Sequence, residues 1–404
     1  MESRRAWTTV IVGTLTMTVS YVDRQTLSVL APHVTQALHM TDAEYGLLGS
    51  AFALAYLVAT PISGWWLDGI GARRGLVRSL FAWSTVAALH AIVPGFATLL
   101  CFRVALGLAE GPGFPGGAQT VQRMLPEAAQ PRGFGILFIG SSLGGMITPP
   151  LASWLFREFD WRTAFLGSAV VGLAWIPLWM FVTRHDDVRE RLDRSRDTAE
   201  PRMRFRELVT SPIVIRAMIA VVASSPIVLF VEQWGSKFLV GELAVTQGDV
   251  GHYLWLPPLW FDLGALALGH LAAITRRGFA PPRTLYAIAT LLGATLVLMP
   301  LAHSPWQAIA VMSVAQLGSG ALRTLVTADL LVRIPRHAIA FAGGTLACAQ
   351  SIAYIVAGPL IGSAHDHHVA YPTIAVVIAA WLVPGSLVWI AWRPADRLER
   401  KVLL

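Results

Sequence analysis

The sequence predicts an all-α integral membrane protein whose twelve transmembrane helices form two pseudo-symmetric six-helix bundles. Three observations support this prediction. Of the 404 residues, 55% are hydrophobic and only 14% are charged, whereas soluble domains carry about 25% charged residues. Twelve apolar stretches are each long enough to cross the roughly 30 Å hydrocarbon core of a bilayer. A charged stretch separates the first six from the last six.

These stretches predict helices, because a backbone in the bilayer core must satisfy its own hydrogen bonds. The first six spans are predicted at Trp7–Ala31, Gly46–Leu67, Leu76–Val93, Ala97–Val121, Gly133–Phe156 and Ala164–Val182. The last six are predicted at Pro212–Leu239, Val250–Thr275, Thr284–Leu301, Trp306–Leu331, Ala338–Ser363 and Pro372–Trp392.

The cations set the predicted orientation. Of the 31 Lys and Arg residues, 25 lie at the ends that this topology makes cytoplasmic, which predicts that both termini are cytoplasmic. We expect an amino-terminal bundle over residues 1–183, a charged cytoplasmic linker over 184–210 and a carboxy-terminal bundle over 211–404. Between Thr183 and Ser211 stand eight Arg and seven acidic residues. This linker is either an amphipathic helix on the inner leaflet or a disordered connection.

The same features exclude other classes of protein. The basic residues lie between apolar runs and form no continuous stripe, so no nucleic acid is expected as a partner despite the net charge of +7. The two cysteines, Cys101 and Cys348, sit inside apolar runs, which excludes a disulfide scaffold. A membrane enzyme needs a nucleophile with a base, or metal ligands, at one depth. His90 near a helix end, and Asp262 and His270 eight residues apart, do not provide this, so we expect no enzyme. His365, Asp366, His367 and His368 have the composition of a metal site but stand in a short predicted outer loop, so we expect no metal site.

Two predicted spans carry charges where charges are costly. The first contains Asp23 and Arg24, and the fourth contains Arg103 and Glu110. A charge at the bilayer centre costs at least about 2.5–3.5 kcal/mol, so each is a candidate for function. Arg103 and Glu110 are seven residues apart, which places them on one helix face about 10 Å apart along the axis. Asp23 can then pair with Arg103, and Arg24 with Glu110. The alternative is a tetrad that only clamps the two spans together, but apolar packing would do this without burying four charges.

A loop motif follows the second predicted span. It contains Gly64, Asp68, Gly69, Arg73 and Arg74, and a related copy in the second half contains Gly269, Arg276 and Arg277. The motif resembles the G-x-x-x-D-R-x-G-R-R loop of the major facilitator superfamily, with Gly69 where a basic residue is usual. The resemblance implies the major facilitator fold. Asp68, Arg73 and Arg74 are then either a gate that bridges differently in two conformations or a solvated loop that only sets topology.

Further motifs sharpen the resemblance to the anion:cation symporter family. Those in the first half are Asp23-Arg24-x-x-Leu27-Ser28-x-x-Ala31-Pro32, Arg103-x-x-x-Gly107-x-x-Glu110-Gly111-Pro112 and Gly140-Ser141. In the second half, Phe261-Asp262-Leu263-Gly264 is similar to the A-D-x-G of the hexuronate, glucarate and galactonate branch, and Thr327-Ala328-Asp329-Leu330 is similar to its P-A-D-L-F.

The resemblance implies roles for individual residues. Asp23 and Glu110 would carry protons, which are the only coupling agents expected, with no cofactor. Arg24, Arg103 and Tyr56 would contact the substrate carboxylate or couple it to the protons. We also expect substrate contacts from Tyr21, Ser141, Gln233, Trp234, Arg323 and Gln350. Asp329 would join the gating residues. The protein would lie in a bacterial inner membrane, act as a monomer and bind a small organic anion.

Two residues depart from the family pattern. Glu232 stands where the sugar-acid branch has no acid, and it either hydrogen-bonds substrate hydroxyls, adds a protonatable site or pairs with Lys237. The second departure is Arg323, which stands where a small or amide residue is usual, whereas Asp262 matches the family motif and is a weaker candidate for the site. Arg323 stands six residues before Asp329 and either contacts the substrate or forms a structural ion pair. As a second cation, it would suit a dianion or an aromatic acid.

The predicted function is therefore proton-coupled import of a sugar acid or other carboxylate by alternating access. The alternative is an exchanger or exporter of amphiphilic or aromatic compounds on the same fold, which predicts an uncharged, aromatic-lined first half. The four charges in the first half favour the importer.

Overall fold

The computed structural model describes residues 2–193, 210–275, 282–334 and 339–392, and the regular secondary structure in these ranges is entirely helical. Intramolecular contacts divide the chain into two units. The amino-terminal unit comprises Met1–Thr198 and Ser236–Trp255, and the carboxy-terminal unit comprises Ala199–Gly235 and Leu256–Leu404. Each unit is described by itself.

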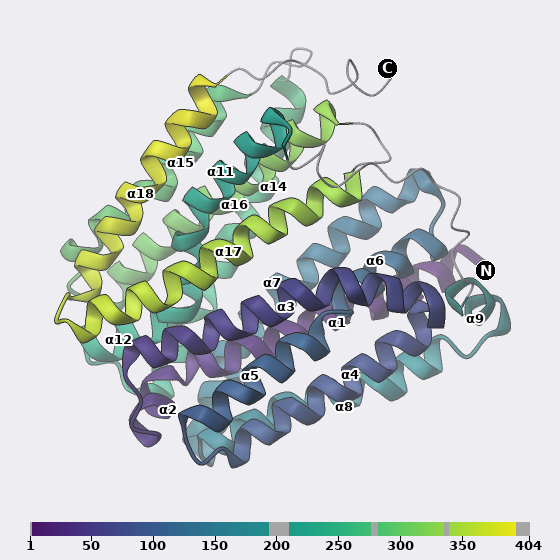
Figure 1. Ribbon diagram of the computed structural model, residues 1–404, viewed down its shortest axis with the longest axis horizontal. Coiled ribbons are helices and arrows are strands. Elements are labelled where there is room, and N and C mark those ends of the chain that lie inside the picture. The colour runs from purple at the N-terminus through teal and green to yellow at the C-terminus, as the bar shows by residue number, and fades with distance from the viewer. Residues whose placement is uncertain (1, 194–209, 276–281, 335–338, 393–404) are drawn as a thin grey trace. The chain divides into compact units, whose positions relative to one another are not determined.

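The amino-terminal unit is built around α1, which packs along α6, α7 and α8, while α3 packs along α5 and α4 along α8 (Figure 1). Its helices are α1 (Glu2–Val29), α2 (Ala31–Ala37), α3 (Asp42–Ile70), α4 (Ala72–Leu89), α5 (Phe96–Glu110), α6 (Gly113–Met124), α7 (Gln130–Glu158), α8 (Trp161–Val182), α9 (Asp186–Asp193), α12 (Gly235–Leu243) and α13 (Val250–Leu254). Short 3-10 turns occupy His90–Ile92, Glu127–Ala129 and Gln247–Asp249.

Local sequence explains where several of these helices begin. Thr41 and Glu44 form a reciprocal capping box at the start of α3. Asp160 caps α8, and hydrogen bonds from Thr163 hold the pKa of the Asp160 carboxyl below its ordinary value. The predicted fourth span is divided into α5 and α6, because Pro112 lacks a backbone N–H and cannot continue the hydrogen-bond ladder of α5.

The carboxy-terminal unit contains α11 (Pro212–Leu229), a π-helical turn (Phe230–Trp234), α14 (Leu256–Thr275), α15 (Arg283–Ala294), a 3-10 helix (Thr295–Leu301), α16 (Pro305–Arg333), α17 (Ile339–Asp366) and α18 (Tyr371–Ala391). Helix α16 is its centre and packs on α11, α14 and α15. The α14–α16 approach requires glycine, because a Cβ placed on Gly320 would lie 1.9 Å from the carbonyl oxygen of Phe261.

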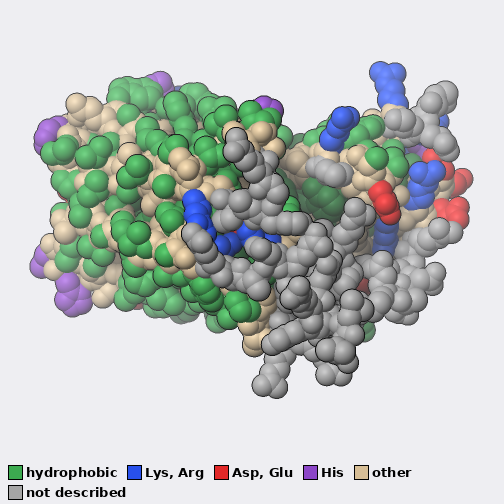
Figure 2. Space-filling model, turned by 90° about the horizontal axis from the view of Figure 1, so that it is seen from above, with side chains coloured by type: hydrophobic (Ala, Val, Ile, Leu, Met, Phe, Trp, Pro, Cys, Tyr) green, Lys and Arg blue, Asp and Glu red, His purple; other side chains and the backbone are tan. Residues whose placement is uncertain are grey.

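Ten helices in the described ranges are long and apolar enough to cross a membrane. The two predicted spans outside this set are α1, which contains Asp23, Arg24 and a series of threonines, and the divided pair α5 and α6. These are the two spans that carry the four predicted site charges. Both units expose large apolar side chains, such as Trp65 at 76% and Leu291 at 71%, and Figure 2 shows hydrophobic side chains over much of the visible surface. Such surfaces suit lipid. The total of twelve spans and the orientation of the termini stay predictions.

The described part of the linker is helical, as the first alternative expects, but its apolar face lies against protein. Helix α9 packs on α4 and α6, and Val188 and Leu192 on its apolar face are fully buried. Its apolar side chains are therefore covered by protein rather than by the inner leaflet. Residues 194–209 of the predicted linker lie outside the described residues.

Candidate functional site

An ion pair joins α1 to α5 inside the amino-terminal unit. Arg24 Nε lies 2.6 Å from Glu110 Oε2, and the Ser20 hydroxyl donates to the same oxygen at 2.7 Å. The side chain of Glu110 is fully buried, while that of Arg24 is 20% exposed. The predicted pairing of these two residues is confirmed.

The second predicted pair does not form. Asp23 and Arg103 are 2% and 4% exposed, and no ion pair joins them within the described ranges. Neither carboxylate oxygen of Asp23 has a hydrogen-bond partner there, and neither do Arg103 Nε and Nη1 or Glu110 Oε1. Buried polar atoms are nearly always paired, so five unpaired atoms in one cluster are informative. They mark a place where a proton or a ligand atom would be stabilised.

Aromatic rings surround the two guanidinium groups. The Arg24 Cζ atom lies 4.4 Å from the ring centroid of Tyr56, 4.8 Å from that of Phe52 and 5.4 Å from that of Tyr21. Arg103 Cζ lies 4.7 Å from the centroid of Phe52. The structure thus brings the predicted residues Tyr21 and Tyr56 to Arg24. Sequence reasoning missed Phe52, because a phenylalanine within an apolar span carries no signal of its own.

Close backbone packing holds these helices together. A Cβ on Gly107 would lie 2.5 Å from the carbonyl oxygen of Phe52, so glycine lets α5 approach α3 directly. On the other side of α1, the Thr18 hydroxyl donates to the carbonyl of Gly140 on α7 at 2.9 Å. The predicted contact residue Ser141 follows Gly140 and is half-buried.

The carboxy-terminal unit contains a polar chain of three side chains. Arg323 Nη1 donates to Gln350 Oε1 at 2.6 Å, and Gln350 Nε2 donates to the Tyr354 hydroxyl at 3.1 Å. The structure therefore brings together Arg323 and Gln350, both predicted as substrate contacts. All three residues are half-buried.

Asp329 has different partners from those considered in the sequence. Its two carboxylate oxygens accept hydrogen bonds from Arg216 and from Arg333 Nε, the latter at 3.0 Å. Arg216, on α11, also donates to the Trp392 carbonyl at 3.1 Å. Sequence reasoning missed Arg216 as a partner of Asp329, because the two residues are 113 positions apart in the sequence.

The π-helical turn contains three predicted residues. Glu232 and Gln233 are half-buried, and the buried ring of Trp234 lies 6.0 Å from the ring of Tyr371. π-helical turns occur frequently at functional sites. Asp262 on α14 is also half-buried. The contacts of these residues do not assign them a role, so their roles stay predictions.

The pairing of Glu232 with Lys237 stays a prediction, because the two residues belong to different units. Lys237 belongs to the amino-terminal unit, where its ammonium group lies 2.5 Å from Asp42 and donates to the Thr35 hydroxyl at 2.9 Å. Asp42 begins α3, so this ion pair joins α12 to the start of α3.

The gating residues predicted in the loop motif, Asp68, Arg73 and Arg74, divide between two clusters of the amino-terminal unit. Asp68 accepts a hydrogen bond from Gln119 at 2.8 Å and lies 4.0 Å from Arg123. Arg73 and Arg74 instead face Asp193 of α9, at 4.0 and 3.6 Å. Arg276 and Arg277 of the second motif copy lie outside the described residues.

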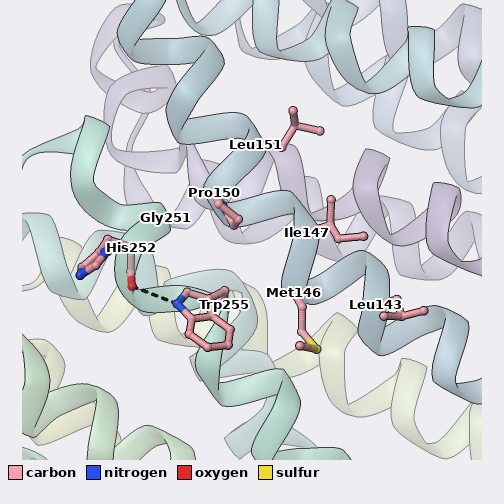
Figure 3. Close-up of a pocket in the computed structure, with 8 residues that line it drawn as sticks. All are labelled: Leu143, Met146, Ile147, Pro150, Leu151, Gly251, His252 and Trp255. Atoms are coloured by element: carbon pink, nitrogen blue, oxygen red, sulfur yellow. Dashed lines mark hydrogen bonds between the residues drawn. The ribbon is translucent and has the colours of Figure 1, made fainter.

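A separate apolar groove of about 560 Å³ lies between α7 and α13 (Figure 3). Its lining residues are Leu143, Met146, Ile147, Pro150, Leu151, Gly251, His252 and Trp255. Neither arginine nor lysine lines it, so the groove does not suit a carboxylate. Within the described ranges, no group of three or more His, Cys, Asp and Glu side chains is arranged to hold a metal ion.

The arrangement of helices and buried charges can be compared with known proteins. The family model described as the Major Facilitator Superfamily matches residues 13–358. The chain belongs to the Major Facilitator Superfamily. It is therefore a membrane transporter and not an enzyme, and it is a multi-pass protein of a bacterial inner membrane.

Individual relatives agree with the sugar-acid branch. The chain is 24% identical over 415 residues to the hexuronate transporter of Escherichia coli (strain K12), covering 97% of this chain and 95% of that protein. It is 26% identical over 390 residues to a probable galactarate/D-glucarate transporter of Bacillus subtilis (strain 168), covering 88% and 85%. The fold is similar to that of a bacterial homologue of the human lysosomal transporter Spinster, with a TM-score of 0.78, 16% identity and coverage of 97% and 99%.

Proposed function

We propose that this transporter imports an organic anion, a sugar acid or a related carboxylate, together with protons by alternating access. The observation that carries the proposal is the buried cluster of Asp23, Arg24, Arg103 and Glu110, in which one ion pair is made and the other polar atoms are unpaired. The names of the sugar-acid relatives support the choice of substrate class.

The substrate carboxylate would bind at Arg103. A guanidinium stays charged and presents a fork of N–H donors that matches a carboxylate. Two of these nitrogen atoms, Nε and Nη1, are buried without a partner, so an arriving carboxylate would displace no protein group from them. Tyr21 and Tyr56, which lie around Arg24, would border the same site.

Protons would bind at Asp23 and Glu110. An ionised carboxylate that forms no ion pair costs several kcal/mol in a buried position, so we expect Asp23 to bind a proton while the site is empty. A substrate anion that attracts Arg24 would compete with Glu110 for the guanidinium and favour protonation of Glu110. Substrate and proton would then bind cooperatively, as linkage requires.

In the carboxy-terminal unit, the Arg323–Gln350–Tyr354 chain offers a second set of donors. Arg323 and Gln350 remain proposed substrate contacts, and their polar groups suit hydroxyl groups or a second acidic group. Both termini would be cytoplasmic, and Asp68 with Arg123 and Asp193 with Arg73 and Arg74 would stabilise one conformation of the cytoplasmic end.

A thermal-shift screen of the purified protein against sugar acids, dicarboxylates and aromatic acids tests the substrate class, and counterflow of a radiolabelled hit in proteoliposomes tests transport. We expect stabilisation by D-galacturonate or galactarate and counterflow of the same compound. Stabilisation by neutral amphiphiles alone would contradict the proposal and favour the exporter.

A further inference from the structure

One aromatic ring contacts both arginines of the buried site. Phe52 is 7% exposed on α3, and the Cζ atoms of Arg24 and Arg103 lie 4.8 and 4.7 Å from its centroid. The two arginines come from α1 and α5. A cation within about 6 Å of a ring centroid is attracted by the electrons of the ring face, and the attraction grows when water is excluded.

The two cations differ in their other partners. Arg24 has Glu110 as a counter-ion, whereas Arg103 Nε and Nη1 have no hydrogen-bond partner in the described ranges. A protein carboxylate paired with Arg103 would stabilise the guanidinium charge, but it would also occupy the N–H donors of Arg103. The Phe52 ring stabilises the charge and accepts no conventional hydrogen bond. The N–H donors of Arg103 therefore remain available for an anion.

The backbone and a neighbouring ring fix Phe52 in place. Its carbonyl group packs against Gly107 of α5, where a Cβ would lie 2.5 Å from the carbonyl oxygen. Its ring stacks on that of Tyr56, with the centroids 6.0 Å apart and the planes 15° apart. Gly107 lies between Arg103 and Glu110 in the sequence, so the packing that places Phe52 also places α5 and its two charges.

We propose that Phe52 is a positioning residue that holds Arg24 and Arg103 as a preorganised pair of cations for the substrate carboxylate. This inference rests on the proposed function in taking the ligand to be an anion. Phe52 itself forms no hydrogen bond to the substrate. It reduces the cost of keeping two like charges buried side by side before the anion arrives.

Phenylalanine analogues with one, two and three ring fluorines at position 52 test the proposal. Fluorine withdraws electron density from the ring face and changes its shape little, so packing is kept while the cation attraction falls. The matched control is the same series at Phe165, which is buried and contacts the rings of His90 and Trp161. The two readouts are the thermal midpoint of the ligand-free protein and its affinity for D-galacturonate.

We expect the thermal midpoint and the affinity to fall stepwise with fluorination at position 52 and to stay constant at position 165. The affinity should be about tenfold lower for the trifluorinated ring. A constant midpoint at position 52 would overturn the proposal, and so would a falling midpoint with unchanged affinity, since Phe52 would then be only structural. If the unsubstituted protein does not bind D-galacturonate, the proposed substrate fails, and the midpoint series still decides whether Phe52 stabilises the cations.

Discussion

The two units bury their charges in different ways. In the carboxy-terminal unit, both oxygens of Asp329 are bound, one by Arg216 and the other by Arg333. In the amino-terminal unit, neither oxygen of Asp23 is bound within the described ranges, and Arg103 has two unpaired nitrogen atoms. All five residues are at most 4% exposed. The two clusters therefore differ in hydrogen bonding and not in how deeply their side chains are buried.

This contrast predicts that the charges around Asp329 stabilise the fold and that those around Asp23 and Arg103 bind a ligand or a proton. A buried carboxylate with both oxygens bound compensates its own desolvation and that of its arginines. An unpaired buried group costs free energy that a proton or an anion can recover. We therefore expect the stability of the protein to depend on the Asp329 cluster, which comprises Asp329, Arg216 and Arg333. Substrate binding and proton coupling should depend on the Asp23 cluster, which comprises Asp23, Arg24, Arg103 and Glu110.

The largest expected effect is a loss of stability at Asp329. Asp329→Asn leaves Arg216 and Arg333 buried without a full counter-charge, which should cost about 3–5 kcal/mol. Asp23→Asn replaces an unbound carboxyl by a neutral amide and should change stability by less than about 1 kcal/mol. Thermal midpoints of the two purified variants measure the difference. Equal losses at both positions would remove the distinction between the clusters.

The next largest effect concerns substrate affinity. Arg103→Lys replaces a forked guanidinium by a point charge. A hydrogen bond to a charged group contributes about 1.5–3 kcal/mol, so affinity for the hit of the thermal-shift screen should fall by about a hundredfold while expression and folding persist. Arg162→Lys, at an exposed arginine near the start of α8, is the control. Unchanged affinity in Arg103→Lys would place the carboxylate elsewhere.

The smallest effect is expected at the predicted gate. Asp68→Asn weakens the contacts to Gln119 and Arg123 and touches no ligand. The transport rate should fall by a few fold, with substrate affinity unchanged, because the substitution biases conformations only. Glu127→Gln, an exposed acid in the nearby turn, is the matched control. A large loss of affinity at Asp68 would contradict a purely gating role.

The sequence predicted the helical membrane fold well, because bilayer thickness and backbone hydrogen bonding leave few alternatives to helices of about twenty apolar residues. It also predicted the ion pair of Arg24 with Glu110, because charged residues within membrane spans are rare and usually pair with one another. Whether Asp23 meets Arg103 depends on side-chain directions that spacing does not determine. The structure shows that Arg103 lies over the ring of Phe52.

Contacts between distant segments could not be predicted. Asp193 forms an ion pair with Arg74, and Asp42 forms one with Lys237. From the sequence alone, each of these acids could have paired with another basic residue. Helix packing decides such choices, and a linker rich in both signs of charge offers many equivalent pairs. The same limit explains why Arg216 was not connected with Asp329.

The central claim is that Glu110 couples the substrate to protons. Import of an anion against a negative interior costs about 2.3 kcal/mol per charge per 100 mV, and a co-transported proton removes this cost. The direct test is accumulation of radiolabelled D-galacturonate in proteoliposomes under an imposed pH gradient, for the native protein and for Glu110→Gln. We predict that the native protein accumulates substrate, more as the external pH falls and not in the presence of a protonophore. Glu110→Gln should exchange substrate without accumulating it, because the amide mimics the protonated acid. Accumulation by Glu110→Gln at the native level would contradict the account.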